Sequence, residues 1–112
     1  MAKLHLLKTE ADFARFQRSR PQQTLALKIR IVPTVNQNFP RFGFIVPKKI
    51  LPKVTDRNVV KRRLKAILAK HQGSLQPVDI LLFPYRPALQ KKFMDLEAET
   101  LQLFKRAGIW KS

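Results

Sequence analysis

The residues that could transfer protons or bind a metal are few, and their spacing does not group them. The chain has two histidines, His5 near its start and His71 on the apolar stripe of an expected helix, where a packed imidazole is the simpler interpretation. Three acids lie close together at Asp95, Glu97 and Glu99, but helical spacing turns Glu97 away from the other two. We interpret them as a solvated, salt-bridged face. No catalytic or metal-ligating residue is therefore predicted, and any reaction would use groups that another molecule supplies.

A basic stretch from residue 48 to 65 is the strongest chemical signal in the sequence. It holds eight cations and a single acid, in a chain with 23 Lys and Arg against 7 Asp and Glu and a net charge of +16. Such a surplus repels itself in a compact protein unless a polyanion neutralises it. Nucleic acid is the leading partner. A membrane surface would require a basic segment whose apolar face is free for lipid, whereas the apolar stripes of this chain are needed for a core.

The residue types inside this stretch favour specific contacts over diffuse attraction. Arg57 and Arg62 can each hold a phosphate through two parallel hydrogen bonds. Asn58 adds no charge, so an amide at this position indicates a directed hydrogen bond to a base edge or a sugar hydroxyl.

Length and composition predict one soluble domain over residues 1–112. There is no cysteine, so disulfides and thiolate metal sites are excluded. Charges at Lys8, Glu10 and Asp12 interrupt any signal-peptide core, and no apolar run approaches the roughly 20 residues that cross a bilayer. We expect a cytoplasmic protein.

Hydrophobic periodicity predicts the elements that must position the basic stretch. Alternation in "TLALKIRIV" is typical of a half-buried strand, and "RFGFIV" is expected to pair with it antiparallel. The continuous apolar run "VDILLF" suits a strand covered on both faces. The sequence thus predicts helices near 10–18, 55–72 and 87–107, the last ended by Gly108, and strands near 25–32, 41–46 and 78–83.

The central helix is expected to be two-sided. At 100° per residue, one stripe collects Val60, Leu64, Ile67, Leu68 and His71. The flank beside it collects Arg57, Asn58, Lys61, Arg62 and Lys65. One flank should pack while its neighbour presents charge.

In these residues the sequence resembles the bacterial ribonuclease P protein family. The resemblance rests on Arg57, Asn58, Lys61 and Arg62 on a helix, after a strand that leads into Lys48 and Lys49 in "GFIVPKK". It extends to "DILLFPYRPA" and to "LLKTEADF", and so covers most of the chain. The chain departs from the family at Val59, where many members have arginine, at Lys65 and Ala66, where many have an Arg-Glu pair, at Pro47 and at Gln17.

The resemblance implies a fold and a division of labour. The fold would be an α+β two-layer sandwich, a mixed sheet of about four strands packed with three helices in the order α-β-β-(β)-α-β-α, with a left-handed β-α-β crossover. The protein would be the non-catalytic subunit of an endoribonuclease, while the ribonuclease P RNA with Mg²⁺ cleaves the 5′ leader from precursor tRNA. It would act as a monomer in the holoenzyme, with no cofactor of its own.

The same resemblance assigns two sets of contact residues. A cleft between the sheet and the first helix would guide the single-stranded leader, where Phe13 and Phe16 could stack on bases, although core packing is the usual role of such residues. The set expected on the catalytic RNA is Lys48, Lys49, Lys53, Arg57, Asn58, Lys61, Arg62 and Lys65.

Two other functions remain open from the sequence. A structural RNA-binding protein, such as a ribosomal protein or an assembly factor, could use the same basic helix without any part in cleavage. A protein that reads the DNA major groove is less compatible, because the sequence offers no two-helix docking unit.

Overall fold

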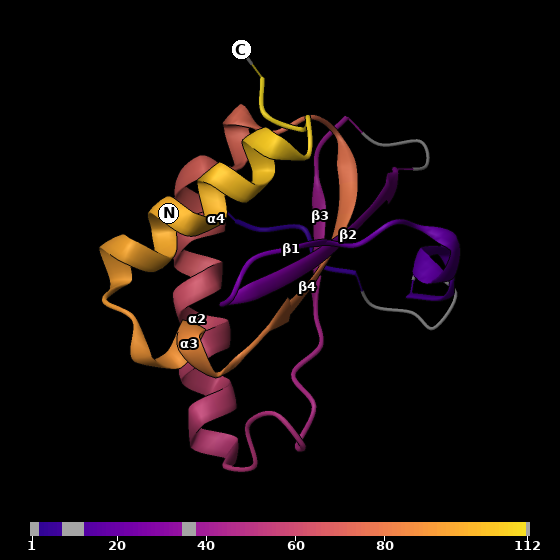
Figure 1. The fold of residues 1–112 in the computed structure, drawn as a ribbon. Coiled ribbons are helices and arrows are strands. Elements are labelled where there is room, and N and C mark those ends of the chain that lie inside the picture. Colours follow the sequence, from indigo (N-terminus) through magenta and orange to yellow (C-terminus); the bar gives the residue numbers. More distant parts are fainter. Residues whose placement is uncertain (1–2, 8–12, 35–37, 112) are drawn as a thin grey trace.

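Figure 1 shows the chain as a computed structural model, which describes residues 3–7, 13–34 and 38–111. Part of the predicted first helix, residues 10–12, lies outside these ranges, and the described part is helical from residue 13 into the 3₁₀ turn η1 (Arg15–Arg18). The strands are β1 (Gln22–Gln23), β2 (Leu27–Pro33), β3 (Arg41–Phe44) and β4 (Val78–Pro84). The remaining helical segments are α2 (Val54–His71), η2 (Gln72–Ser74), α3 (Arg86–Gln90) and α4 (Phe93–Arg106).

The strands form one mixed sheet in the order β1-β2-β4-β3. β4 is central, because it pairs antiparallel with β2 and parallel with β3. The expected direct pairing of the strands near 25–32 and 41–46 was wrong. β4 is apolar on both faces and has the pattern of an interior strand, so it enters between them and buries more surface there than at an edge.

Parallel pairing of β3 with β4 requires a crossover, and α2 provides it. This arrangement confirms the predicted mixed sheet, which has four strands in the α+β class. The left-handed form of the crossover stays a prediction.

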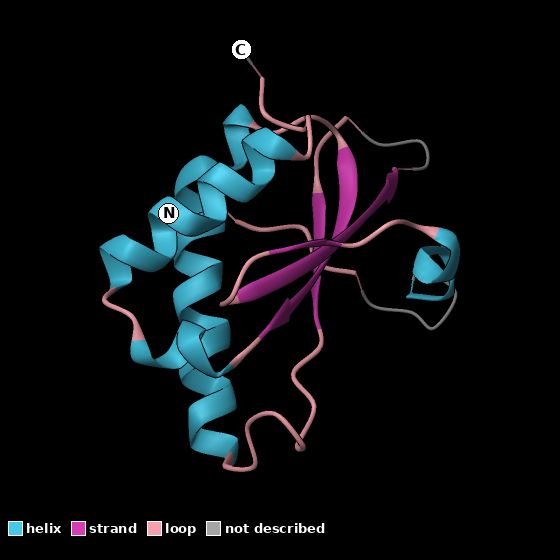
Figure 2. Ribbon diagram, viewed as in Figure 1, coloured by secondary structure: helices cyan, strands magenta, loops and turns pink. Residues whose placement is uncertain are grey.

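Helices cover the two faces of the sheet unequally. In Figure 2, α2, α3 and α4 lie together on one side of the strands, and the N-terminal helical turn lies on the other. The core divides in the same way, with a large cluster under α2 and α4 and a small one under η1 that is formed by Leu7, Phe16 and Leu81. The thinly covered face is therefore the one on which the sheet can present side chains to a ligand.

The central helix α2 packs as its periodicity predicted. Val60, Leu64, Ile67 and Leu68 are all fully buried, and each such side chain contributes roughly 2 kcal/mol through its removal from water. His71 is only half-buried and lies at the end of this stripe. The sequence favours Thr55 or Asp56 as the N-cap of this helix, but that expectation was wrong: the helix begins at Val54, and Lys53 is the N-cap in extended conformation without a side-chain cap bond.

The predicted C-terminal helix is divided in two. α3 ends at Gln90, Lys91 and Lys92 are extended, and α4 begins at Phe93. Phe93, the first residue of α4, is 39% exposed. Gly108 ends α4 as predicted, with φ of +79°, and the Ile109 amide donates back to the carbonyl of Phe104 at 3.3 Å.

An N-terminal segment, residues 3–7, adds to the free edge of the sheet. Leu6 forms a parallel bridge to Phe42, and the Leu7 amide donates to the Phe42 carbonyl at 2.8 Å. This pairing covers the edge of β3 and carries the segment towards α2. Among the described residues no helix is long and apolar enough to span a membrane.

Candidate nucleic-acid interface

The predicted RNA-binding side chains lie on the loop before α2 and on its unpacked flank. Lys48, Lys49 and Lys53 are exposed on the loop, and Asn58, Arg62 and Lys65 are exposed on the helix. Arg57 and Lys61 are half-buried. The apolar stripe of α2 faces the core, so this basic flank stays open to solvent beside it.

Two arginines of α2 are partly or wholly engaged by the protein itself. Arg57 donates through Nη1 to the carbonyls of Leu51 and Pro52, both at 2.8 Å, which leaves its other nitrogens available. Arg63, which is not in the predicted set, donates to the end of α3, with its shortest bond of 2.7 Å to the Lys91 carbonyl. Arg63 therefore stabilises the packing of α3 on α2 rather than the basic flank.

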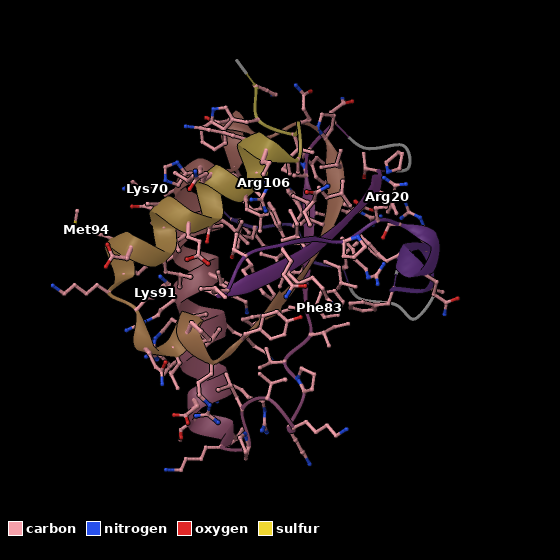
Figure 3. All side chains as sticks on the ribbon, in the orientation of Figure 1. Arg20, Lys70, Phe83, Lys91, Met94 and Arg106 are labelled. Atoms are coloured by element: carbon pink, nitrogen blue, oxygen red, sulfur yellow. The ribbon has the colours of Figure 1, made fainter. Side chains whose placement is uncertain are left out.

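Three of the described acids, Asp79, Glu97 and Glu99, form ion pairs with cations outside the predicted set. Glu97 pairs with Lys70 and His71, and Glu99 pairs with Lys91. Figure 3 labels Lys70 and Lys91 on the helical side of the molecule, opposite Arg20. Over residues 3–7, 13–34 and 38–111, none of the seven cations in the predicted set forms an ion pair. Their charge is thus left for an external anion.

The pKa values of the helical-side acids follow from these contacts. Hydrogen bonds from His71 and Lys70 lower the pKa of Glu97. Burial raises the pKa of Glu99, but bonds from the Thr24 hydroxyl, the Ala26 amide and Lys91 outweigh it, so the net shift is downward. Both carboxylates are fixed anions at neutral pH, and within the described residues no group of three or more His, Cys, Asp or Glu could hold a metal ion.

A hollow opens on the thinly covered face of the sheet. It has a volume of about 300 Å³ and is lined by Phe13, Phe16, Gln17, Arg30, Leu81 and Phe83. Phe13 is half-buried and so offers surface for stacking, whereas Phe16 is 1% exposed and supports the hollow from beneath. The leader contact predicted for the two rings stays a prediction, and accessible surface favours Phe13.

The sequence reasoning missed two strand cations here, Arg30, which lines the hollow, and Lys28, which lies over the lining residue Phe83. Lys28 pairs across the strands with Phe83, and its Nζ lies 4.3 Å from the centre of that ring. Arg30, two residues on and on the same face, donates to the Ser19 carbonyl. The alternation of β2 had already placed both cations on the face opposite Leu27 and Ile29, so the signal was present. The sequence did not show which strand lies beside β2, and this information comes only from the sheet order.

A buried carboxylate fixes the first helix over this face. The register places Asp79 opposite Arg41, which donates to it through Nε at 2.9 Å and Nη2 at 2.7 Å. Arg15 of η1 reaches the same carboxylate at 2.7 Å, and it also donates to the Pro33 carbonyl. Burial raises the pKa of Asp79, but the bonds from Arg41 and Arg15 outweigh it and the pKa is lowered. Asp79 is therefore an anion that positions the wall of the hollow.

Gly43 lets the first helix approach the sheet closely. A Cβ at this position would lie 3.0 Å from both Phe13 Cε1 and Leu81 Cδ1. A second hollow of about 180 Å³ brings Phe13, Gly43 and Phe44 together with Lys61 and Lys65 of α2. The basic flank and the aromatic face are therefore adjoining parts of one surface.

Comparison with known proteins agrees with this geometry. A family model described as Ribonuclease P matches residues 1–108. The chain belongs to the ribonuclease P protein family. The ribonuclease P protein component of Synechocystis is 28% identical over 95 residues, which cover 84% of this chain and 77% of the relative. That of Streptococcus gordonii is 27% identical and covers 98% of this chain and 92% of its own.

The fold of the ribonuclease P protein family is also the fold of this chain. The solved RNase P protein of Staphylococcus aureus superimposes with a TM-score of 0.85 at 20% sequence identity, over 97% of this chain and all of the other. Membership ties the chain to an endoribonuclease complex and to tRNA processing.

Proposed function

We propose that this chain is the protein subunit of ribonuclease P and that it contributes binding surface, not catalytic groups. The observation that carries the proposal is the adjacency of two surfaces. One is the basic flank on α2, whose cations form no ion pair with the acids that the structure describes, and the other is an aromatic face on the sheet. The first suits the phosphates of a folded RNA, and the second suits the bases of a single strand. The catalytic RNA and its Mg²⁺ would supply the cleavage chemistry.

Each surface has a partner in this proposal. Lys48, Lys49, Lys53 and the flank of α2 bind the ribonuclease P RNA, where Asn58 makes a directed hydrogen bond. The hollow under Phe13, with Lys28 and Arg30 at its strands, holds the 5′ leader of precursor tRNA. The protein acts in the cytoplasm as a monomer on one RNA.

Reconstitution tests the proposal. The protein is added to the ribonuclease P RNA of its own organism with precursor tRNA at low Mg²⁺, and the cleavage rate is compared with that of the RNA alone. We expect faster cleavage and tighter binding of substrate that carries a leader. If the protein binds the RNA but changes neither quantity, a structural RNA-binding role replaces the subunit role.

Mature tRNA, which has no leader, is the matched control, and the protein should not change its affinity. A leader-binding hollow can contribute only when a leader is present, so the gain should be confined to the precursor. An equal gain for both substrates would place the protein's effect on the RNA fold instead.

A further inference from the structure

A further concave surface lies on the far side of the basic flank, between the N-terminal segment and α2. We call it the N-terminal slot. Its walls are Leu4 and Leu6 of the segment and Ala66 and Ala69 of the helix, and Lys3, Arg62 and Lys65 surround them. The volume is about 480 Å³, which is the size of a small-molecule site.

Contacts to the backbone of the N-terminal segment fix both ends of the slot. The bridge from Leu6 to Phe42 fixes one end of the segment, and Gln72 Nε2 donates to the Lys3 carbonyl at 3.3 Å at the other. Leu4 and Leu6 also pack partly against the main core. The apolar wall therefore stands at a defined distance from α2.

The helix side of the slot is open because its residues are small. Ala66 and Ala69 are three apart and so lie on one face of α2. Ala66 is exposed and Ala69 half-buried. A longer side chain at either position would project into the space that the leucines enclose.

The chemistry of the slot combines an apolar interior with a cationic rim. All three charged residues that line it are basic, and none of its lining residues in the described part of the chain carries a carboxylate. A phosphate alone would gain nothing from the leucines, and an uncharged apolar ligand would gain nothing from the rim. An unpaired nucleotide satisfies both, since its base is flat and weakly polar on its faces while its flanking phosphates are anionic.

We propose that the N-terminal slot receives one unstacked nucleobase of the ribonuclease P RNA, with the adjoining phosphates held by Lys3, Arg62 and Lys65. This inference rests on the proposed function and adds to it a contact that reads the RNA by shape rather than by charge. Two of the rim cations belong to the basic flank, so a strand already bound there passes the mouth of the slot. That continuity favours an RNA base over an acyl chain or an acidic peptide.

The test fills the slot without changing its charge. Leucine has high helix propensity, so Ala66→Leu should leave α2 intact while its side chain occupies the base position. We expect its affinity for the catalytic RNA to fall about tenfold, the low end for loss of a stacked base. The salt slope of that affinity should stay unchanged, because no phosphate contact is removed. The matched control is Ala98→Leu, an equal change at an exposed alanine of α4.

A second measurement identifies the occupant. A photo-reactive side chain at position 66 is cross-linked in the complex, and the modified nucleotide is located by primer extension. RNA that lacks the base at that nucleotide should bind the wild type about tenfold more weakly, and Ala66→Leu should add no further loss. The two changes are then not additive, which two independent contacts would not produce.

Each other outcome counts against the slot as a base site. If Ala66→Leu binds the RNA as the wild type does, the slot is empty in the complex, and the proposed function still stands. If the complex forms but the photo-reactive side chain at position 66 modifies no nucleotide, no RNA base occupies the slot. If the wild type does not bind the RNA at all, both the proposed function and the base site are refuted, whatever the result for Ala66→Leu.

Discussion

Replacing Asp79 by asparagine should loosen the first helix from the sheet with almost no change in volume. The carboxylate is fully buried, while Arg15 and Arg41 are 29% and 19% exposed. It accepts three bonds from these two guanidinium groups. An amide keeps a single acceptor oxygen and loses the charge that compensates both arginines.

The size of the effect follows from this geometry. Breaking a buried ion pair by removing one partner costs about 3 to 5 kcal/mol. The arginines are partly exposed and can regain water, so we expect the lower end, about 3 kcal/mol from the free energy of unfolding. For a domain of this length that corresponds to a fall in Tm of about 10 °C.

Urea unfolding at several pH values provides the assay. The pKa of Asp79 is lower in the folded protein than its ordinary value of 3.8. Its contribution is therefore complete well above that pH and is lost as the pH falls through the folded pKa. The difference between wild type and Asp79→Asn should be constant near neutrality and should shrink below pH 3.8.

Asp95→Asn is the control, because Asp95 is exposed in the first turn of α4. This substitution should lower the free energy of unfolding by less than about 1 kcal/mol. A loss for Asp79→Asn no larger than the control's would refute the reasoning. So would a difference between Asp79→Asn and the wild type that persists unchanged at pH 2.

Further substitutions separate positioning from contact on the sheet face. Gly43→Ala should displace the Phe13 ring, costing about 1 to 3 kcal/mol of stability by overpacking and weakening leader binding, as measured with precursor and mature tRNA. Phe13→Ala should weaken precursor binding about tenfold at unchanged affinity for mature tRNA. Phe16→Ala should instead lower the free energy of unfolding by about 3 to 5 kcal/mol, because its ring is buried. Leader affinity that is equally insensitive to Gly43→Ala and Phe13→Ala would remove this face from the site.

Local periodicity was enough to predict most of the elements. β2 and α2 each bury one face, and the period of two in β2 and the apolar stripe of α2 show which residues lie on that face. A short stretch of sequence is therefore enough to predict each element. The break between α3 and α4 was missed because its cause is distant. Arg63 of α2 binds the carbonyls at the end of α3, and no pattern near residue 91 announces that contact.

The candidate site also has one part that local sequence predicts and one part that depends on distant contacts. The basic flank could be predicted because charge and helical spacing both lie in one stretch, residues 57–65. A cleft at Phe13 and Phe16 was expected only from the family resemblance, and its strand residues could not be predicted because they depend on β4 lying between β2 and β3. That order brings Phe83 beside Lys28 and Asp79 beside Arg41, pairs separated by long stretches of chain.

We expect the basic stretch to engage fewer phosphates than its charge suggests. Eight cations between residues 48 and 65 would give a slope of log affinity against log salt of about −7 if each bound a phosphate. Arg63 is committed to α3, and Arg57 and Lys61 are half-buried, which leaves five exposed cations. We therefore expect about five contacts and a slope of about −4.5.

Arg62→Ala and Arg63→Ala, neighbours of equal charge, distinguish the two kinds of arginine. Arg62→Ala should make the slope shallower by about one unit at unchanged stability. Arg63→Ala should leave the slope as it is and cost about 1 to 3 kcal/mol of stability, because three carbonyls lose a charged donor. Equal changes in slope for both would mean that RNA draws Arg63 away from α3, and the division of this helix into a structural and a binding side would be wrong.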